Sequence, residues 1–196
     1  MKRDLPSIRV IRFKTRLSDR GGLVLRRFRL RDSRRLRALF AAASFHETVG
    51  AKAPTSACLL RFWRWLHRTF QWFYTINGPP GGTEGIIGFI GLYGIQGNRA
   101  VKLAIAFFNP GDRRRGYGRR ALELLLDDFR RRAVVQAVHV DVSAGNAVSI
   151  DFFRGLDFQP VDAGGGIREL MLPLGSAQKQ IHKINASPAR RRPPRP

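Results

Sequence analysis

Three residues between a predicted strand and a predicted helix have the types and the spacing of an anion-binding loop. Arg113, Gly116 and Gly118 form the pattern R-x-x-G-x-G within Asn109–Phe129, NPGDRRRGYGRRALELLLDDF. Glycines lack a Cβ and let the backbone approach a ligand closely. The first turn of a helix offers free N–H groups and a partial positive charge, and arginines add charge-assisted hydrogen bonds. The pattern therefore predicts a cradle for a phosphate or pyrophosphate.

The elements on both sides of this loop are predicted from periodicity and from turn residues. Glu84–Gln96 and Ala100–Pro110 are expected to form a hairpin, whose second strand ends at the proline. A helix follows the loop and runs to about Arg132. The stretch Val134–Ser143 is largely apolar, as expected for a strand that is buried on both faces. The loop thus lies in a strand–loop–helix–strand unit.

The rest of the chain supplies further elements of both kinds and no internal repeat. The predicted elements are a strand at Gly22–Leu30, a helix from Asp32 or Ser33 to about Phe45, a helix at about Cys58–Trp72, a short helix at Asn146–Leu156, a strand at DFQPV and a strand at Ile167–Leu174. This alternation predicts a mixed α/β fold.

Length and composition indicate one compact domain with tails. The chain has 196 residues, of which 43% are hydrophobic, enough for a core. We expect a basic arm or first strand at 1–20, the domain at 21–174 and a disordered Arg/Pro tail at 175–196. Cys58 is the only cysteine, which excludes an internal disulfide and a cysteine-based zinc site. The sequence shows no signal-peptide core and no membrane-spanning run, so we expect a cytoplasmic protein without a metal.

The net charge of +22 admits two explanations. It favours a polyanionic partner such as RNA or an acidic surface, and the basic tail predicts non-specific nucleic-acid binding. The 30 arginines and 6 lysines are also what GC-rich codon usage produces. The helix at Cys58–Trp72 carries Trp65 and Trp72 beside its arginines. This helix either meets a polyanion or packs on the sheet with arginine stems over the indoles.

The loop and its context resemble motif A of the GNAT N-acetyltransferase superfamily, R/Q-x-x-G-x-G/A. Pro110 stands six residues before Gly116, as in the family. The family's later pattern N-x-x-A-x-x-x-Y-x-x-x-G-F is similar to NAVSIDFFRGLDF, from Asn146 to Phe158. The resemblance is close from Glu84 to Pro173 and extends in outline to Gly22. A dinucleotide-binding G-x-G-x-x-G is not met, because its third glycine is replaced by alanine.

The resemblance implies a fold, a cofactor and an activity. The fold would be a central mixed, mostly antiparallel sheet of about six to seven strands, splayed at the cofactor site and flanked by about four helices. The cofactor would be acetyl-coenzyme A, and a primary amine would attack its thioester directly. The backbone amide of Phe108 would polarise the thioester carbonyl. The residues that the resemblance assigns to cofactor binding are Ala106, Phe107, Phe108, Arg113, Arg114, Arg115, Gly116, Tyr117, Gly118, Arg119, Asn146 and Phe153.

The chain departs from the family at two positions that often carry catalysis. Phe153 replaces a tyrosine that protonates the departing thiolate, and Lys102 stands where many relatives have a glutamate. Tyr93 is the first candidate for a replacement, followed by His46 and Glu47. Approximation of the reactants alone also supplies much of the rate.

Two functions remain open from the sequence. The first is an acetyltransferase acting on an amine, as a monomer or homodimer. A protein amine or aminoacyl-tRNA is favoured over a polyamine or aminoglycoside, because +22 repels cations. The alternative is a catalytically weak coenzyme A-binding module that acts through RNA or protein binding. We expect His139 and Asp141, which alternate with valines, to be structural.

Overall fold

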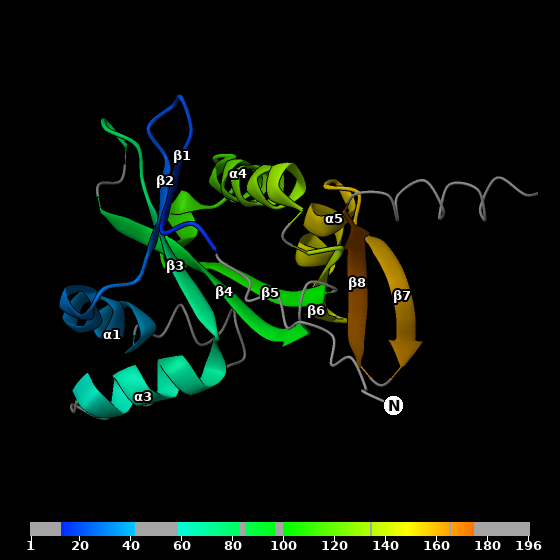
Figure 1. The fold of residues 1–196 in the computed structure, drawn as a ribbon, viewed down its shortest axis with the longest axis horizontal. Helices are drawn as coiled ribbons and strands as arrows, with labels where there is room; N and C mark the ends of the chain where they lie inside the picture. The colour runs from blue at the N-terminus through cyan, green and yellow to red at the C-terminus, as the bar shows by residue number, and fades with distance from the viewer. Residues whose placement is uncertain are drawn as a thin grey trace, which may run out of the picture.

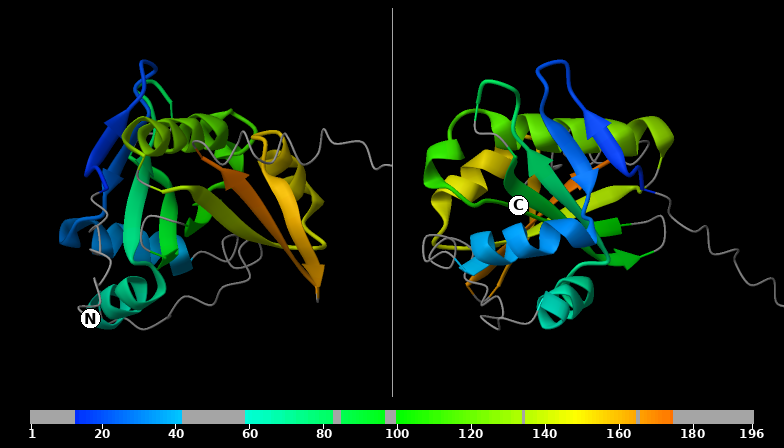
Figure 2. Two further views of the ribbon diagram at one scale, coloured as in Figure 1. Left: turned by 45° about the vertical axis from the view of Figure 1, so that its right-hand side comes forward. Right: turned by 90° about the vertical axis from the view of Figure 1, so that its left-hand side faces the viewer.

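A computed structural model describes residues 13–41, 59–82, 85–96, 100–133, 135–164 and 166–174. One open sheet has the strand order β1-β2-β3-β4-β5-β6-β8-β7, with α1 and α3 on one face and α4 and α5 on the other (Figures 1 and 2). The strands are β1 (Arg16–Ser18), β2 (Val24–Arg27), β3 (Trp72–Asn77), β4 (Ile86–Gln96), β5 (Ala100–Phe107), β6 (Ala137–Ser143), β7 (Gln159–Gly164) and β8 (Ile167–Pro173). The helices are α1 (Ser33–Ala41), α3 (Leu59–Thr69), α4 (Tyr117–Arg132) and α5 (Ala147–Arg154), with short 3-10 turns η1 (Leu30–Asp32) and η2 (Pro110–Asp112).

The mixed α/β fold that the sequence predicts is confirmed, with eight strands in place of six to seven. The main difference is β3, because the sequence assigned Trp72 to the preceding helix. The helix ends at Thr69. The Phe70 amide still donates to Leu66 O (2.9 Å), but the Gln71 amide donates to Leu92 O (2.8 Å) on β4. The chain therefore changes from helix to strand within two residues.

The sheet opens between β5 and β6, as expected. These two strands form the sheet's parallel pair, and their pairing covers only Ala100–Lys102 and Ala137–His139. Beyond these residues β5 continues to Phe107 and β6 to Ser143 without pairing to each other. The pairs β4–β5 and β6–β8 stay antiparallel over their lengths. A gap therefore lies between the C-terminal halves of β5 and β6.

The two faces of the sheet bury separate cores. Val101 and Leu103 belong to the core under α4 and α5. Because side chains alternate along a strand, Ala104 and Ala106 face the second core, under α1 and α3. That second core is rich in phenylalanine, including Phe40, Phe62, Phe70, Phe73, Phe89 and Phe108. In the described part of the chain no helix is long and apolar enough to cross a membrane.

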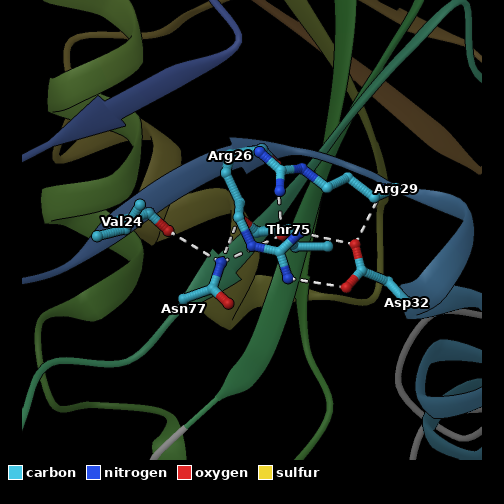
Figure 3. Close-up of polar contacts among 6 residues, drawn as sticks. All are labelled: Val24, Arg26, Arg29, Asp32, Thr75 and Asn77. Carbon is cyan, nitrogen blue, oxygen red and sulfur yellow. Dashed lines mark hydrogen bonds and ion pairs between the residues drawn. The ribbon is translucent and has the colours of Figure 1, made fainter.

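A polar contact holds the start of α1 against β2 (Figure 3). Arg26 donates two hydrogen bonds to the carboxylate of Asp32, at 2.7 and 2.8 Å, and the Arg29 amide donates a third at 2.9 Å. Thr75 and Asn77 of β3 donate to the carbonyl oxygens of Arg26 and Val24. The turn η1 is therefore fixed to the sheet before α1 begins.

Candidate functional site

The loop between β5 and α4 is held by its own backbone. Asn109 accepts from the Gly111 amide through Oδ1 (2.9 Å). The amides of Asp112 and Arg113 donate to Asn109 O (3.0 Å) and Pro110 O (3.1 Å). These bonds order the residues from Asn109 to Arg113, ahead of the arginines and glycines that lead into α4.

The first turn of α4 has amides without a partner inside the helix. The Arg120 amide donates to Gly116 O (3.0 Å), so the N–H groups of Tyr117, Gly118 and Arg119 precede the first helical bond. Gly116 is the N-cap residue and provides no side-chain cap. Free N–H groups at the positive end of a helix are suited to bind a phosphate.

Glycine is favoured at the two positions of the motif for different physical reasons. Gly116 has φ of 76°, which favours glycine, and a Cβ there would meet nothing within 4 Å. At Gly118 a Cβ would lie 3.3 Å from the Phe152 ring and 3.4 Å from the Phe107 ring. Gly116 therefore allows the turn, and Gly118 lets α4 pack closely against Phe152 and Phe107. Both properties fit the predicted pyrophosphate cradle.

Some of the side chains expected at the cofactor lie elsewhere. Arg119 donates to Gly155 O (2.9 Å) and lies 3.6 Å from Glu123, so it links α4 to the end of α5. The ring of Tyr117 is buried in the core. Arg114 and Arg115 are exposed and Arg113 is half-buried. The groups of Tyr117 and Arg119 that could bind a phosphate are therefore their backbone amides, and not their side chains.

The backbone of β5 places different amides in the gap from the one that the sequence suggested. The Phe108 amide donates to Ile87 O (3.0 Å), so it belongs to the ladder with β4, and its ring is buried under α1 and α3. Hydrogen-bonded pairs alternate along an antiparallel ladder, and the register pairs Ala106 with Phe89. Ile105 and Phe107 therefore turn their N–H and C=O groups away from β4, toward the gap. The Phe108 amide, to which the sequence assigned the oxyanion role, is therefore engaged by β4 and does not face the gap.

Two predicted residues on α5 have structural contacts. Asn146 caps the helix, since its Oδ1 accepts from the Ser149 amide (3.1 Å). Phe153 is buried, and its ring centroid lies 5.1 Å from that of Phe152 and 5.3 Å from that of Phe158. The capping role that the asparagine's position suggests is therefore present in the structure.

A charged cluster that the sequence did not predict lies on the face of the sheet that carries α1 and α3. Lys102 on β5 contacts both carboxylate oxygens of Asp141 on β6, at 2.9 Å each, and Glu169 on β8 at 3.3 Å. Glu169 also contacts Nδ1 of His139 (3.1 Å). The Tyr93 hydroxyl on β4 lies 3.5 Å from Asp141. We call these five residues the Lys102 cluster.

The electrostatics of the Lys102 cluster fix the protonation of two members. The hydrogen bond to Asp141 is the main cause that raises the pKa of Lys102, so its ammonium is charged at neutral pH. Burial, followed by the charge of Asp141, raises the pKa of Tyr93, so its hydroxyl keeps its proton. Within the described residues no three His, Cys, Asp or Glu side chains could hold a metal ion.

The cluster could be foreseen only in part. Tyr93 was expected to be catalytic and lies in it, and His139 and Asp141 were expected to be structural. Glu169 was not singled out, because only strand register brings it beside Lys102. The candidates His46 and Glu47 lie outside the residues that the structure describes.

Comparison with known proteins agrees with this geometry. A family model of the acetyltransferase (GNAT) domain matches residues 22–159. A comparison with curated proteins gives no match. Among solved structures, a probable GNAT-family acetyltransferase from Chromobacterium violaceum has a TM-score of 0.67 at 18% identity, with 88% of this chain and 94% of that chain covered.

Two further structures show the same fold. A GCN5-related N-acetyltransferase from Brucella melitensis has a TM-score of 0.67 at 13% identity, with 91% of this chain and 88% of that chain covered. A spermidine N-acetyltransferase from Vibrio cholerae, in complex with CoA and spermine, has a TM-score of 0.62 at 13% identity, with 78% and 95% covered. At these identities the likeness concerns the fold alone. The family model covers well over half of the chain, and the chain belongs to the GNAT acetyltransferase family.

Proposed function

We propose that this GNAT acetyltransferase moves an acetyl group from acetyl-coenzyme A to a primary amine at the gap between β5 and β6. The observation that carries the proposal is the set of uncapped amides of Tyr117, Gly118 and Arg119 beside unpaired backbone groups on β5. When bound, acetyl-coenzyme A supplies the acetyl group as an activated thioester. All other steps are assigned to the chain's own groups.

The gap has a closed end that limits where the reaction takes place. β5 and β6 are still paired at Lys102 and His139, and the phosphate-binding turn lies beyond the other end of β5. Phe107 would therefore pair with the coenzyme's pantetheine arm as a neighbouring strand would. The Ile105 amide, nearer to the closed end, would donate to the thioester carbonyl as charge develops on its oxygen.

The Lys102 cluster lies at this closed end and would handle the acceptor. Asp141 follows His139 on β6 by two residues, at the start of the gap. Its carboxylate would hold the acceptor's ammonium and accept the proton that the amine loses. Tyr93, whose hydroxyl keeps its proton, would donate a hydrogen bond to the departing sulfur. Phe153 has no hydroxyl for that task.

The distribution of charge favours an acceptor on a polyanionic carrier, either an acidic protein or aminoacyl-tRNA. Residues 27–71 hold nine arginines and one lysine against two acids, and one acid, Asp32, is paired with Arg26. Residues 72–174 hold twelve basic residues against ten acids. Codon usage raises the arginine content along the whole chain, but it does not deplete acids from one segment of it. Arg61, Arg64 and Arg68 of α3 are exposed on the side of the sheet that carries the Lys102 cluster.

The test is release of free coenzyme A thiol from acetyl-coenzyme A in the presence of amine acceptors. A small monoamine, an acidic peptide with a free N-terminus and an aminoacyl-tRNA form the panel, with the product identified by mass spectrometry. We expect N-acetylation of at least one of them. If acetyl-coenzyme A binds but no acceptor is acetylated, the alternative of a coenzyme A-binding module without efficient chemistry is favoured instead.

A further inference from the structure

Lys102 lies between two carboxylates at the place where the proposed acceptor would arrive. Its Nζ contacts Asp141 at 2.9 Å and Glu169 at 3.3 Å. The three side chains keep 36%, 31% and 32% of their surface exposed, so they are reachable from the α1–α3 side. An ammonium group of the chain itself therefore occupies the middle of an acidic site.

The charges of the cluster do not balance. Among Lys102, Asp141 and Glu169, two carboxylates face one ammonium, and one negative charge remains. Glu169 is also engaged by His139 at 3.1 Å, whereas Asp141 has the Tyr93 hydroxyl at 3.5 Å as its further partner. The remaining charge suits one added ammonium, and a second would meet the Lys102 ammonium as a like charge.

We propose that Lys102 is a specificity-determining residue that restricts the acceptor to a single ammonium group and disfavours diamines and polyamines. The inference rests on the proposed acetyl transfer and narrows its substrate class. Lys102 takes the position that the second ammonium of a diamine would need between Asp141 and Glu169. A protein N-terminus or an aminoacyl ester offers one amine at its end and satisfies this requirement.

The experiment compares two acceptors that differ by one charge, 1-aminobutane and 1,4-diaminobutane. Wild-type protein should prefer the monoamine in kcat/KM. In Lys102→Met the apolar stem stays and the charge is lost, and the preference should shift by about tenfold toward the diamine, since these charges are partly screened by solvent. The shift should come from KM more than from kcat. Calorimetry with 1,4-diaminobutane on the coenzyme A-saturated protein should show the same gain in affinity without turnover.

Two further variants separate charge balance from structural damage. Lys102→Met/Glu169→Gln restores one net negative charge and should return the preference toward that of the wild type. Arg168→Met removes the same charge from β8, next to Glu169 in sequence. The Arg168 side chain lies on the other face of the sheet, because it alternates with Glu169 and shares its face with the buried Leu170. Arg168→Met should therefore leave the preference between the two amines unchanged.

The outcomes distinguish the inference from the proposed function. The role of Lys102 is overturned, while acetyl transfer stands, if the kcat/KM ratio of monoamine to diamine in Lys102→Met stays within twofold of the wild-type ratio. The same conclusion follows if this ratio shifts equally in Arg168→Met. Equal use of both amines by the wild type overturns it as well. Absence of acetyl-coenzyme A binding in the wild type instead removes the proposed function.

Discussion

The guanidinium of Arg26 and the carboxylate of Asp32 form a two-bond ion pair that joins β2 to the turn before α1 (Figure 3). Asp32 keeps 7% of its surface exposed and Arg26 keeps 17% of its side chain exposed. Burial alone would raise the pKa of Asp32, but the hydrogen bonds from Arg26 and the Arg29 amide outweigh it and lower the pKa.

Asp32→Asn should destabilise the fold at neutral pH. It leaves Arg26 half-buried without its partner, and we expect a loss of about 2 kcal/mol. Because the pKa of Asp32 is lower in the folded state, its contribution is present above the unfolded-state pKa near 4 and is lost as pH falls further. Denaturant unfolding should therefore show a smaller difference in the free energy of unfolding between wild type and Asp32→Asn at pH 3 than at pH 7.

The matched control for this variant is Asp127→Asn. Asp127 contacts Arg130 at 3.3 Å but is 62% exposed, so its loss should change stability by less than about 0.5 kcal/mol. Equal effects of the two variants would contradict the assignment of the Arg26–Asp32 pair as a structural anchor.

Tyr93→Phe should lower kcat by about tenfold and leave acetyl-coenzyme A affinity unchanged. The ring that packs edge-on against Phe70, 6.2 Å between centroids, stays in place, and only the proton donor is lost. Since the pKa of Tyr93 is raised, the wild-type rate should fall through ionisation of Tyr93 only above about pH 10. Initial rates against pH and calorimetry check both points.

Tyr74→Phe is the control for Tyr93→Phe. Tyr74 is buried in the core under α4, and its hydroxyl donates to Lys14 O (2.7 Å). Its loss should reduce stability and spare kcat. If Tyr93→Phe retains full turnover, the hydroxyl has no part in the chemistry.

Arg61→Glu/Arg64→Glu should weaken the use of a large acidic acceptor and spare a small monoamine. Both residues are exposed on α3, and charge reversal there would repel a polyanion before it reaches the gap. We expect KM for an acidic peptide or aminoacyl-tRNA to rise about tenfold at low salt, and its salt dependence to flatten.

The control reverses charge in the other layer, with Arg130→Glu/Arg131→Glu on α4. This pair adds the same charge on the opposite side of the sheet and should leave KM for the large acceptor within about twofold. A similar loss in both double variants would show that overall charge, and not the α3 face, governs the acceptor.

The turn between β5 and α4 can be predicted from the sequence because its signal is local. Gly116 and Gly118 are two residues apart, and the strand before them and the helix after them follow from periodicity. Strand β3 was missed because Phe70 and Phe73 continue the apolar spacing of α3. In the structure the Gln71 amide instead donates to Leu92 O of β4, and this contact depends on the tertiary fold.

The groups that we propose to act on the substrates are harder to predict, because their positions depend on the register between paired strands. A shift of one residue along β5 decides whether the backbone groups of Phe108, or those of Ile105 and Phe107, face the gap. Lys102, Asp141 and Glu169 come from three strands, and their separation along the chain gives no sign of their contact. The sequence therefore predicts the fold and the turn between β5 and α4, and pairing across the sheet assembles the Lys102 cluster.

The most direct measurement of the central claim is calorimetric titration of acetyl-coenzyme A into wild-type protein and Gly118→Glu. The Cβ of the new side chain would contact the rings of Phe152 and Phe107, and its carboxylate would add negative charge in the turn whose amides are assigned to the pyrophosphate. Gln136→Glu adds the same charge at an exposed position before β6, and melting curves confirm folding of both variants. We predict saturable binding to the wild type and to Gln136→Glu, and a loss of roughly a hundredfold in Gly118→Glu. Unchanged affinity in folded Gly118→Glu, or no binding to the wild type, would contradict the account.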